Sequence, residues 1–153
     1  MPSIERADPV ILGHILAEHR AFHEELSAAR AAFTSADRSE ASGVRAAHAC
    51  LATLREHLAR HFAQEEQGGY LEESLNRVPR LSPAVKAVLA DHPALLAELD
   101  GLIERLSRPD IPQSSWEQAH RDFDAFAQHL VAHERNENAV VQEGYNEDLG
   151  LTE

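Results

Sequence analysis

The two halves of this chain repeat one pattern of histidines and carboxylates. An offset of 72 residues aligns three pairs: His57 with His129, His61 with His133, and Glu65 with Glu137. An offset of 73 residues aligns two more: Glu18 with Asp91, and His19 with His92. One buried histidine is usually a core residue with a satisfied hydrogen bond. A repeated set of histidines and acids instead indicates side chains that gather at one shared site.

Helical periodicity surrounds these residues. The chain has 153 residues, much of its apolar content is Ala and Leu, and only 5% of its residues are aromatic. Such a composition favours helix over sheet. Apolar residues recur at helical spacing in four ranges: 9–35, 40–67, 83–107 and 115–143. We therefore predict an all-α protein, a single domain over residues 1–153 that forms an up-down four-helix bundle made of two repeated helical hairpins.

Proline and glycine mark the expected boundaries of these helices. Pro93 lies inside the third range, so we expect a kink or a new helix start near Asp91. Gly68-Gly69 ends the second helix, and a short helical piece follows at 70–76. The fourth helix is expected to stop before Gly144, which leaves an acidic tail at 144–153.

The spacing within each row explains how its residues can meet. Residues four apart on a helix are separated by about 6 Å along the axis and turned by only about 40°, so His61 and Glu65 share one face. Two such faces can enclose two metal ions about 3.5 to 4 Å apart. We expect carboxylate bridges and terminal imidazole ligands from six residues: His19, His61, Glu65, His92, His133 and Glu137. Nitrogen and oxygen donors without sulfur favour iron or manganese over calcium or structural zinc.

Other polar residues near these rows have weaker assignments. His57 and His129 lie one turn before the inner ligands, where they either coordinate metal or donate hydrogen bonds to the ligands. His23 follows His19 by one turn but has Leu96 as its repeat counterpart, so we expect it to be partly buried or solvent-facing. The remaining acids are expected to form a solvated face, with attraction of Fe²⁺ as a weaker alternative: Glu24, Glu25, Glu66, Glu72 and Glu73.

Charge and cysteine content exclude several classes of function. The formal net charge is −12, which repels phosphate backbones and anionic lipid, so we expect neither a nucleic-acid nor a membrane partner. Cys50 is the single cysteine, so neither a disulfide framework nor a thiolate metal site is expected. The first residues contain acids and no long apolar stretch, which predicts a cytoplasmic protein without a signal peptide.

Four segments resemble the hemerythrin-like (HHE cation-binding) domains: EHRAFHEEL, HLARHFAQEE, DHPALLAEL and AQHLVAHERNE. The resemblance covers about residues 8 to 143 and implies a four-helix bundle that holds a non-haem di-iron centre. It assigns the same six residues as metal ligands. The blood-worm oxygen carriers differ in having a second histidine on the third helix, where this chain has Leu96, and His-x4-Asp on the fourth, where this chain has His-x3-Glu. The resemblance therefore does not imply reversible oxygen carriage.

The resemblance implies a protein that binds or senses oxygen, nitric oxide or iron. The expected cofactor is two non-haem iron ions with a bridging oxo or hydroxo group, with manganese or zinc as alternative metals. The expected partner is a small diatomic molecule or peroxide, and the sequence identifies no protein partner. Two alternatives remain open: a di-iron oxidoreductase that acts on peroxide or nitric oxide, and a bundle in which the metal only fastens the helices. A binding or sensing role is favoured over an enzyme because no residue resembles a nucleophile.

Overall fold

The chain folds into helices joined by short connections. The computed structural model describes residues 9–35 and 41–150, with side chains described for 13–34 and 41–145. Within these ranges there is no strand. The elements are α1 (Pro9–Ser35), α2 (Ala41–Glu66), α3 (Tyr70–Arg77), the 3₁₀ helix η1 (Pro79–Leu81), α4 (Ser82–Arg105) and α5 (Gln113–Gly150).

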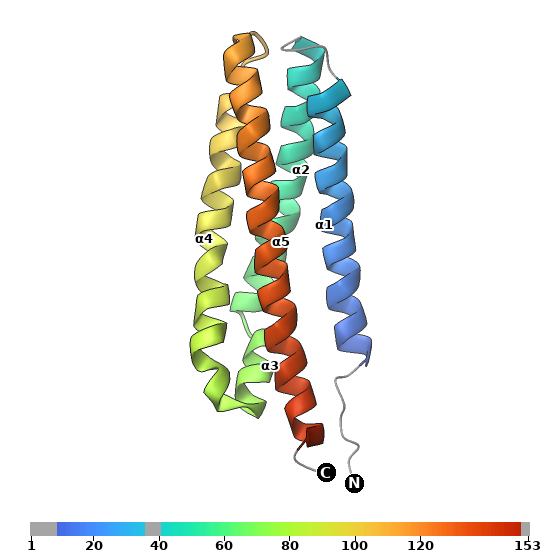
Figure 1. Ribbon diagram of the computed structural model, residues 1–153, viewed down its shortest axis with the longest axis vertical. Coiled ribbons are helices and arrows are strands. Elements are labelled where there is room, and N and C mark those ends of the chain that lie inside the picture. Colours follow the sequence, from blue (N-terminus) through green and yellow to red (C-terminus); the bar gives the residue numbers. More distant parts are fainter. Residues whose placement is uncertain (1–8, 36–40, 151–153) are drawn as a thin grey trace.

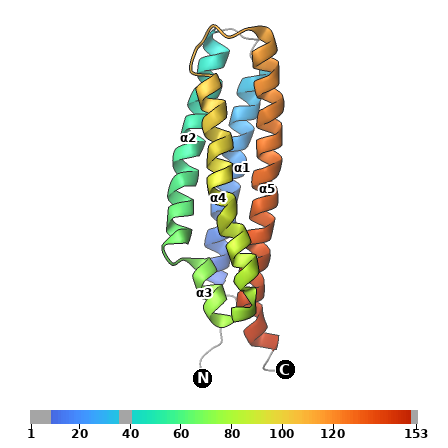
Figure 2. The same cartoon turned by 90° about the vertical axis from the view of Figure 1, so that its left-hand side faces the viewer.

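The four long helices, α1, α2, α4 and α5, lie side by side with alternating directions (Figures 1 and 2). The short helix α3 lies at one end of the bundle and packs mainly against α5. The predicted all-α four-helix bundle is thus confirmed. None of the described helices is both long enough and apolar enough to cross a lipid bilayer.

Two apolar clusters fill the interior, with a layer of buried polar side chains between them. The larger cluster is built from all four long helices and includes the fully buried Leu54, Leu99 and Phe126. The smaller cluster joins α3 to the ends of α1, α4 and α5 and includes Leu71 and Tyr145. On α1, α4 and α5 the buried histidines and glutamates fall between residues of the two clusters. The apolar packing on both sides therefore fixes the positions of the polar layer.

One of the two alternatives expected at Pro93, a new helix start near Asp91, is wrong, and so is the predicted end of the fourth helix before Gly144. Helix α4 continues without a break across Pro93, and Asp91 does not begin a new helix. Proline cannot donate the backbone hydrogen bond at this position, and the buried His92 and Leu95 pack into the core on either side of it. Helix α5 also continues past Gly144 to Gly150, so the predicted acidic tail begins inside a helix. Residues 151–153 of that tail lie outside the described residues.

Helix α5 passes through Gly144 at a close contact with α3. A Cβ atom placed on Gly144 would lie 2.4 Å from Cβ and 2.7 Å from Cα of Ser74 on α3. Ser74 is itself fully buried. The missing side chain at Gly144 therefore allows α3 to pack directly on α5, and the glycine does not act as a helix stop.

This contact predicts opposite effects for two glycine-to-alanine substitutions. Gly144→Ala is expected to lower the free energy of unfolding by about 1 to 3 kcal/mol, the usual effect of overpacking. Gly101→Ala on α4 is the matched control, because a Cβ there has no neighbour within 4 Å, and it should raise that free energy by about 0.5 to 1 kcal/mol. Denaturant unfolding measures both changes. A Gly144→Ala variant as stable as the parent would show that α3 does not pack closely on α5.

Candidate metal centre

The polar layer contains all six residues that the sequence predicts as metal ligands. All six are buried, with exposed fractions of 4% or less: His19, His61, Glu65, His92, His133 and Glu137. They come from all four long helices. The i, i+4 spacing on α2 and α5 turns the histidine and the glutamate of each helix toward the same interior space.

These six side chains form two groups of three, and within each group the donor atoms lie within 4.8 Å of one another. The first donor group is His19, His61 and Glu137, and the second donor group is Glu65, His92 and His133. Each group takes one glutamate and two histidines from three different helices. The structure therefore brings all the predicted ligands together, in two sets of three.

Glu65 connects the two donor groups. Its Oε2 atom lies 2.9 Å from Nε2 of His61 in the first group, and its Oε1 atom lies 3.0 Å from Nε2 of His92 in the second. Glu137 instead faces two histidines of the first group, with Oε1 2.9 Å from Nε2 of His19 and Oε2 3.7 Å from Nε2 of His61. Glu65 thus has the placement of a bridging carboxylate, whereas these contacts of Glu137 stay within one group.

Carboxylates behind the centre orient three of the four histidines. Nδ1 of His61 donates a hydrogen bond to Glu18, and Nδ1 of His133 donates to Asp91 at 3.0 Å. A proton on Nδ1 leaves the Nε2 lone pair free to face a metal, and such partners commonly fix metal-ligating histidines. The sequence showed Glu18 and Asp91 beside His19 and His92, but it did not show that these acids reach across to the neighbouring helix.

The third such carboxylate corrects one prediction. Glu66 was expected to belong to the solvated acidic face, and its side chain is indeed 50% exposed. Its Oε2 nevertheless accepts a hydrogen bond at 2.7 Å from Nδ1 of the buried His92. Because Glu66 directly follows Glu65, one helical turn supplies both an inner donor and the outer partner of a second histidine.

The protonation states suit metal coordination. Burial lowers the pKa of His19 and of His133, which favours the neutral imidazole that a metal needs. Burial alone would raise the pKa of Glu65, but the neighbouring imidazoles of His61 and His92 lower it to about 2. Burial likewise opposes charge on His61, yet Glu65 and Glu18 raise its pKa. Metal binding at His61 therefore competes with protonation of the ring more strongly than at His19 or His133.

Several inward-facing atoms of the centre make no well-aligned hydrogen bond, although Glu65 lies in close ion-pair contact with His61 and His92. These atoms are both carboxylate oxygens of Glu65, Oε2 of Glu137, and Nε2 of His92 and of His133. Buried polar atoms without a partner are costly, on the order of 1 to 3 kcal/mol each. A cation satisfies carboxylate oxygens and imidazole lone pairs together, and this mixed donor set without sulfur suits iron, manganese or zinc. The residues present therefore fit a metal cofactor.

His57 and His129 lie outside both donor groups. Nδ1 of His57 donates to Glu25 at 3.0 Å, and the His57 ring packs on Phe22 with centroids 4.3 Å apart. Nδ1 of His129 donates to Glu98 at 2.8 Å, and its side chain is 59% exposed. In the structure neither histidine lies in a donor group or hydrogen-bonds one of the six predicted ligands. Each ring instead turns toward an acid on the neighbouring helix.

This arrangement predicts that His57 and His129 are dispensable for metal binding. Replacing either residue with alanine is expected to leave the metal content per chain unchanged, because each pairs with an acid outside the two donor groups. Elemental analysis after metal loading and removal of excess metal checks this result. His61→Ala is the matched control on α2 and should lose metal. Loss of an ion in either the His57 or the His129 variant would place that histidine among the ligands.

Sequence reasoning missed a buried acid beside the first donor group. Glu134 is only 4% exposed, burial raises its pKa, and its Oε1 atom accepts a hydrogen bond at 2.7 Å from Nε2 of His23. His23 is about half exposed, as expected. The repeat gave no signal for this pair, because the residue 72 positions before Glu134 is Phe62. Phe62 stacks on His92 with centroids 3.9 Å apart, so the two halves differ next to the centre.

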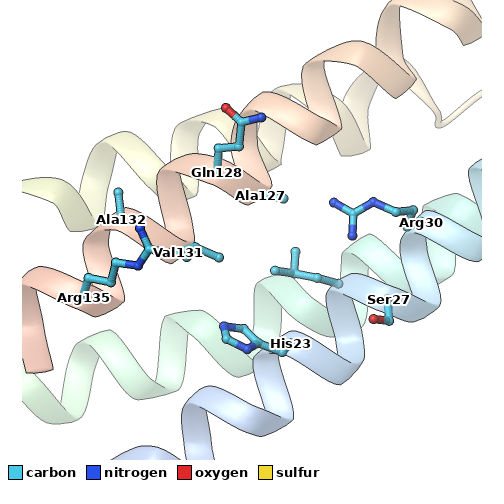
Figure 3. Close-up of a pocket in the computed structure, with 9 residues that line it drawn as sticks. His23, Ser27, Arg30, Ala127, Gln128, Val131, Ala132 and Arg135 are labelled. Atoms are coloured by element: carbon cyan, nitrogen blue, oxygen red, sulfur yellow. The ribbon is translucent and has the colours of Figure 1, made fainter.

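Two surface pockets open between α1 and α5 on the side of the first donor group. One, with a volume of about 400 Å³, is lined by His23, Arg30, Val131 and their neighbours, and His23 points from α1 into the space facing α5 (Figure 3). The other, with a volume of about 290 Å³, is lined by His19, His23, Glu134 and Asn138 among others; we call it the His19 pocket. One histidine of the first donor group therefore borders a pocket.

Comparison with known proteins gives one match. A family described as the hemerythrin HHE cation binding domain matches residues 10–143, a range that contains every member of the two donor groups. Neither the curated proteins nor the solved structures compared with this chain gave a match.

Proposed function

This chain belongs to the hemerythrin HHE cation-binding family, and we propose that it is a non-haem di-iron protein that binds or senses oxygen, nitric oxide or iron through its His/Glu centre. The family establishes cation binding. Iron, the number of ions and the small-molecule ligand are the additional parts of the proposal.

One observation carries the proposal: two donor groups are joined by a single carboxylate. Glu65 directs one oxygen at His61 and the other at His92. A carboxylate that faces two separate groups of donors suits a pair of cations better than one cation. The inward-facing atoms that make no well-aligned hydrogen bond, in both groups, support the same conclusion.

The number of donors favours a centre that binds a small molecule over a purely structural metal site. Two octahedral ions offer about twelve coordination positions. Four imidazoles occupy four, and two carboxylates occupy at most four. About four positions are then left for solvent or for an added ligand, and such open positions are typical of metal sites that bind small molecules. A di-iron centre supplies this open coordination, while the protein supplies its fixed ligands and hydrogen-bonding partners.

The test is the absorption spectrum of the iron-loaded protein in air, recorded before and after addition of azide. We expect near-ultraviolet bands that shift when azide binds, because azide is a small anion that takes up open positions on ferric iron. Glu65→Gln should show neither the bands nor the shift. A spectrum that azide does not change would contradict an open di-iron centre and support a metal that only fastens the helices. Turnover of peroxide well above that of free iron, lost in Glu65→Gln, would favour the oxidoreductase alternative.

A further inference from the structure

The four inner histidines differ in the hydrogen-bond partner of Nδ1. Nδ1 of His61, His92 and His133 each donates to a carboxylate behind the centre. Nδ1 of His19 is buried and makes no hydrogen bond. His19 is therefore the one inner histidine among the described residues without an outer partner.

The internal repeat identifies the residue that stands where that partner belongs. Glu66 directly follows Glu65 and accepts a hydrogen bond from His92. The residue 72 positions after Glu66 is Asn138, which directly follows Glu137. His92 is in turn the repeat counterpart of His19. Oδ1 of Asn138 is buried and accepts no hydrogen bond, and Asn138 and His19 both line the His19 pocket. In the structure Nε2 of His19 donates to Oε1 of Glu137 at 2.9 Å. A cation bound at Nε2 would move the ring proton to Nδ1, and Oδ1 of Asn138 is an acceptor without a donor that lines the same pocket.

We infer that Asn138 is the positioning residue for His19, accepting a hydrogen bond from its Nδ1 in the metal-loaded protein, and that the ion in the first donor group is consequently the exchangeable one. The inference rests on the proposed di-iron function. It adds that the two positions differ in metal affinity, because the residues that hydrogen-bond their histidines differ in charge.

The physical reason lies in the partner of each imidazole. A carboxylate partner makes an imidazole a stronger metal ligand, and a neutral amide does so less. Burial lowers the pKa of His19, and the negative charge of Glu134 only partly opposes that shift. The hydrogen bond of Glu134 goes to His23, so Glu134 does not orient the His19 ring. Access differs as well. The His19 ring borders a surface pocket, whereas the His92 ring is covered by the stacked ring of Phe62.

The test follows loss of metal from the full chain. The protein is loaded anaerobically with Fe²⁺, freed of excess metal and mixed with a chelator that becomes coloured when it takes up ferrous iron. The parent is expected to release its two ions in a fast and a slow phase of equal amplitude. Asn138→Asp should slow the fast phase about tenfold or more and leave the slow phase unchanged, because changes in outer partners typically alter metal affinity by about 10- to 100-fold.

A second variant tests the outer partner of His92 in the second donor group. Glu66→Gln gives His92 a neutral amide in place of its carboxylate, so the slow phase should become about tenfold faster while the fast phase stays the same. Asn136→Asp is the matched control, because it makes the same chemical change as Asn138→Asp at an exposed position of α5. It should change neither phase.

Three outcomes would overturn the inference. One is release of both ions in a single phase by a parent that holds two. Another is an Asn138→Asp variant that behaves like Asn136→Asp. The third is acceleration of the fast phase by Glu66→Gln. A parent that binds fewer than two ions would instead contradict the proposed function itself, so the two failures are distinguishable.

Discussion

Replacement of Glu65 with glutamine is expected to abolish binding of both metal ions. Glu65 is the residue that faces both donor groups, with one oxygen near His61 and the other near His92. A neutral amide of the same size offers one oxygen and one NH₂ group, so it cannot donate to two cations. We expect affinity at both positions to fall by more than about 100-fold, the upper end of what loss of an outer partner alone costs. Metal titration monitored by calorimetry measures this change.

Two comparison variants make the result specific. Glu56→Gln changes an exposed acid on the same helix and should bind metal like the parent. His133→Ala removes a ligand that belongs to the second donor group alone, so it should weaken binding at one position more than at the other. A Glu65→Gln variant that retains both ions at parent affinity would show that Glu65 does not bridge them.

Removal of metal is expected to lower the melting temperature substantially. Without a cation the carboxylates of Glu65 and Glu137 lie buried among imidazoles, and three of their four oxygens make no well-aligned hydrogen bond. Metal at a free concentration 1,000 times its Kd stabilises the folded state by about 4 kcal/mol. For a domain of this size that corresponds to a rise in Tm of roughly 8 to 16 °C. Circular dichroism melts with and without a chelator, followed by readdition of metal, measure the effect.

The control for these melts is the Glu65→Gln variant. The Glu65→Gln variant should melt at one temperature whether chelator or metal is present, because it no longer binds metal. An equal Tm for the loaded and metal-free parent would mean that the two donor groups do not couple metal binding to folding.

The fold could be predicted from the sequence because its main determinants are local. Helical spacing of apolar residues located the four long helices, and short connections required neighbouring helices to be antiparallel. The exceptions are long-range. The contact between Gly144 and Ser74 joins α5 to α3, and no local pattern distinguishes such a glycine from one that stops a helix. Helix α4 likewise continues across Pro93, where the adjacent His92 is buried and stacks on Phe62 of α2.

The inner residues of the site could be predicted because each row lies on one helix. His61 and Glu65 share a face by spacing alone, and the repeat indicated that His133 and Glu137 do the same. The outer partners could not be predicted, because they depend on the register between helices. Spacing along α1 does not show that Glu18 reaches His61.

His57 and His129 show the limit of arguments from one helix face. They share a face with the inner ligands, yet each ring turns toward an acid on the neighbouring helix, Glu25 or Glu98. The pair of Glu134 and His23 shows the complementary limit. It breaks the repeat, so a comparison of the two halves could not reveal it.

The most direct test of the two-ion centre is the metal content per chain, determined by elemental analysis of the purified protein. We predict two iron ions per chain, since six buried donors form two groups joined by Glu65. One zinc ion per chain, or no metal in a well-folded protein, would contradict the di-iron centre.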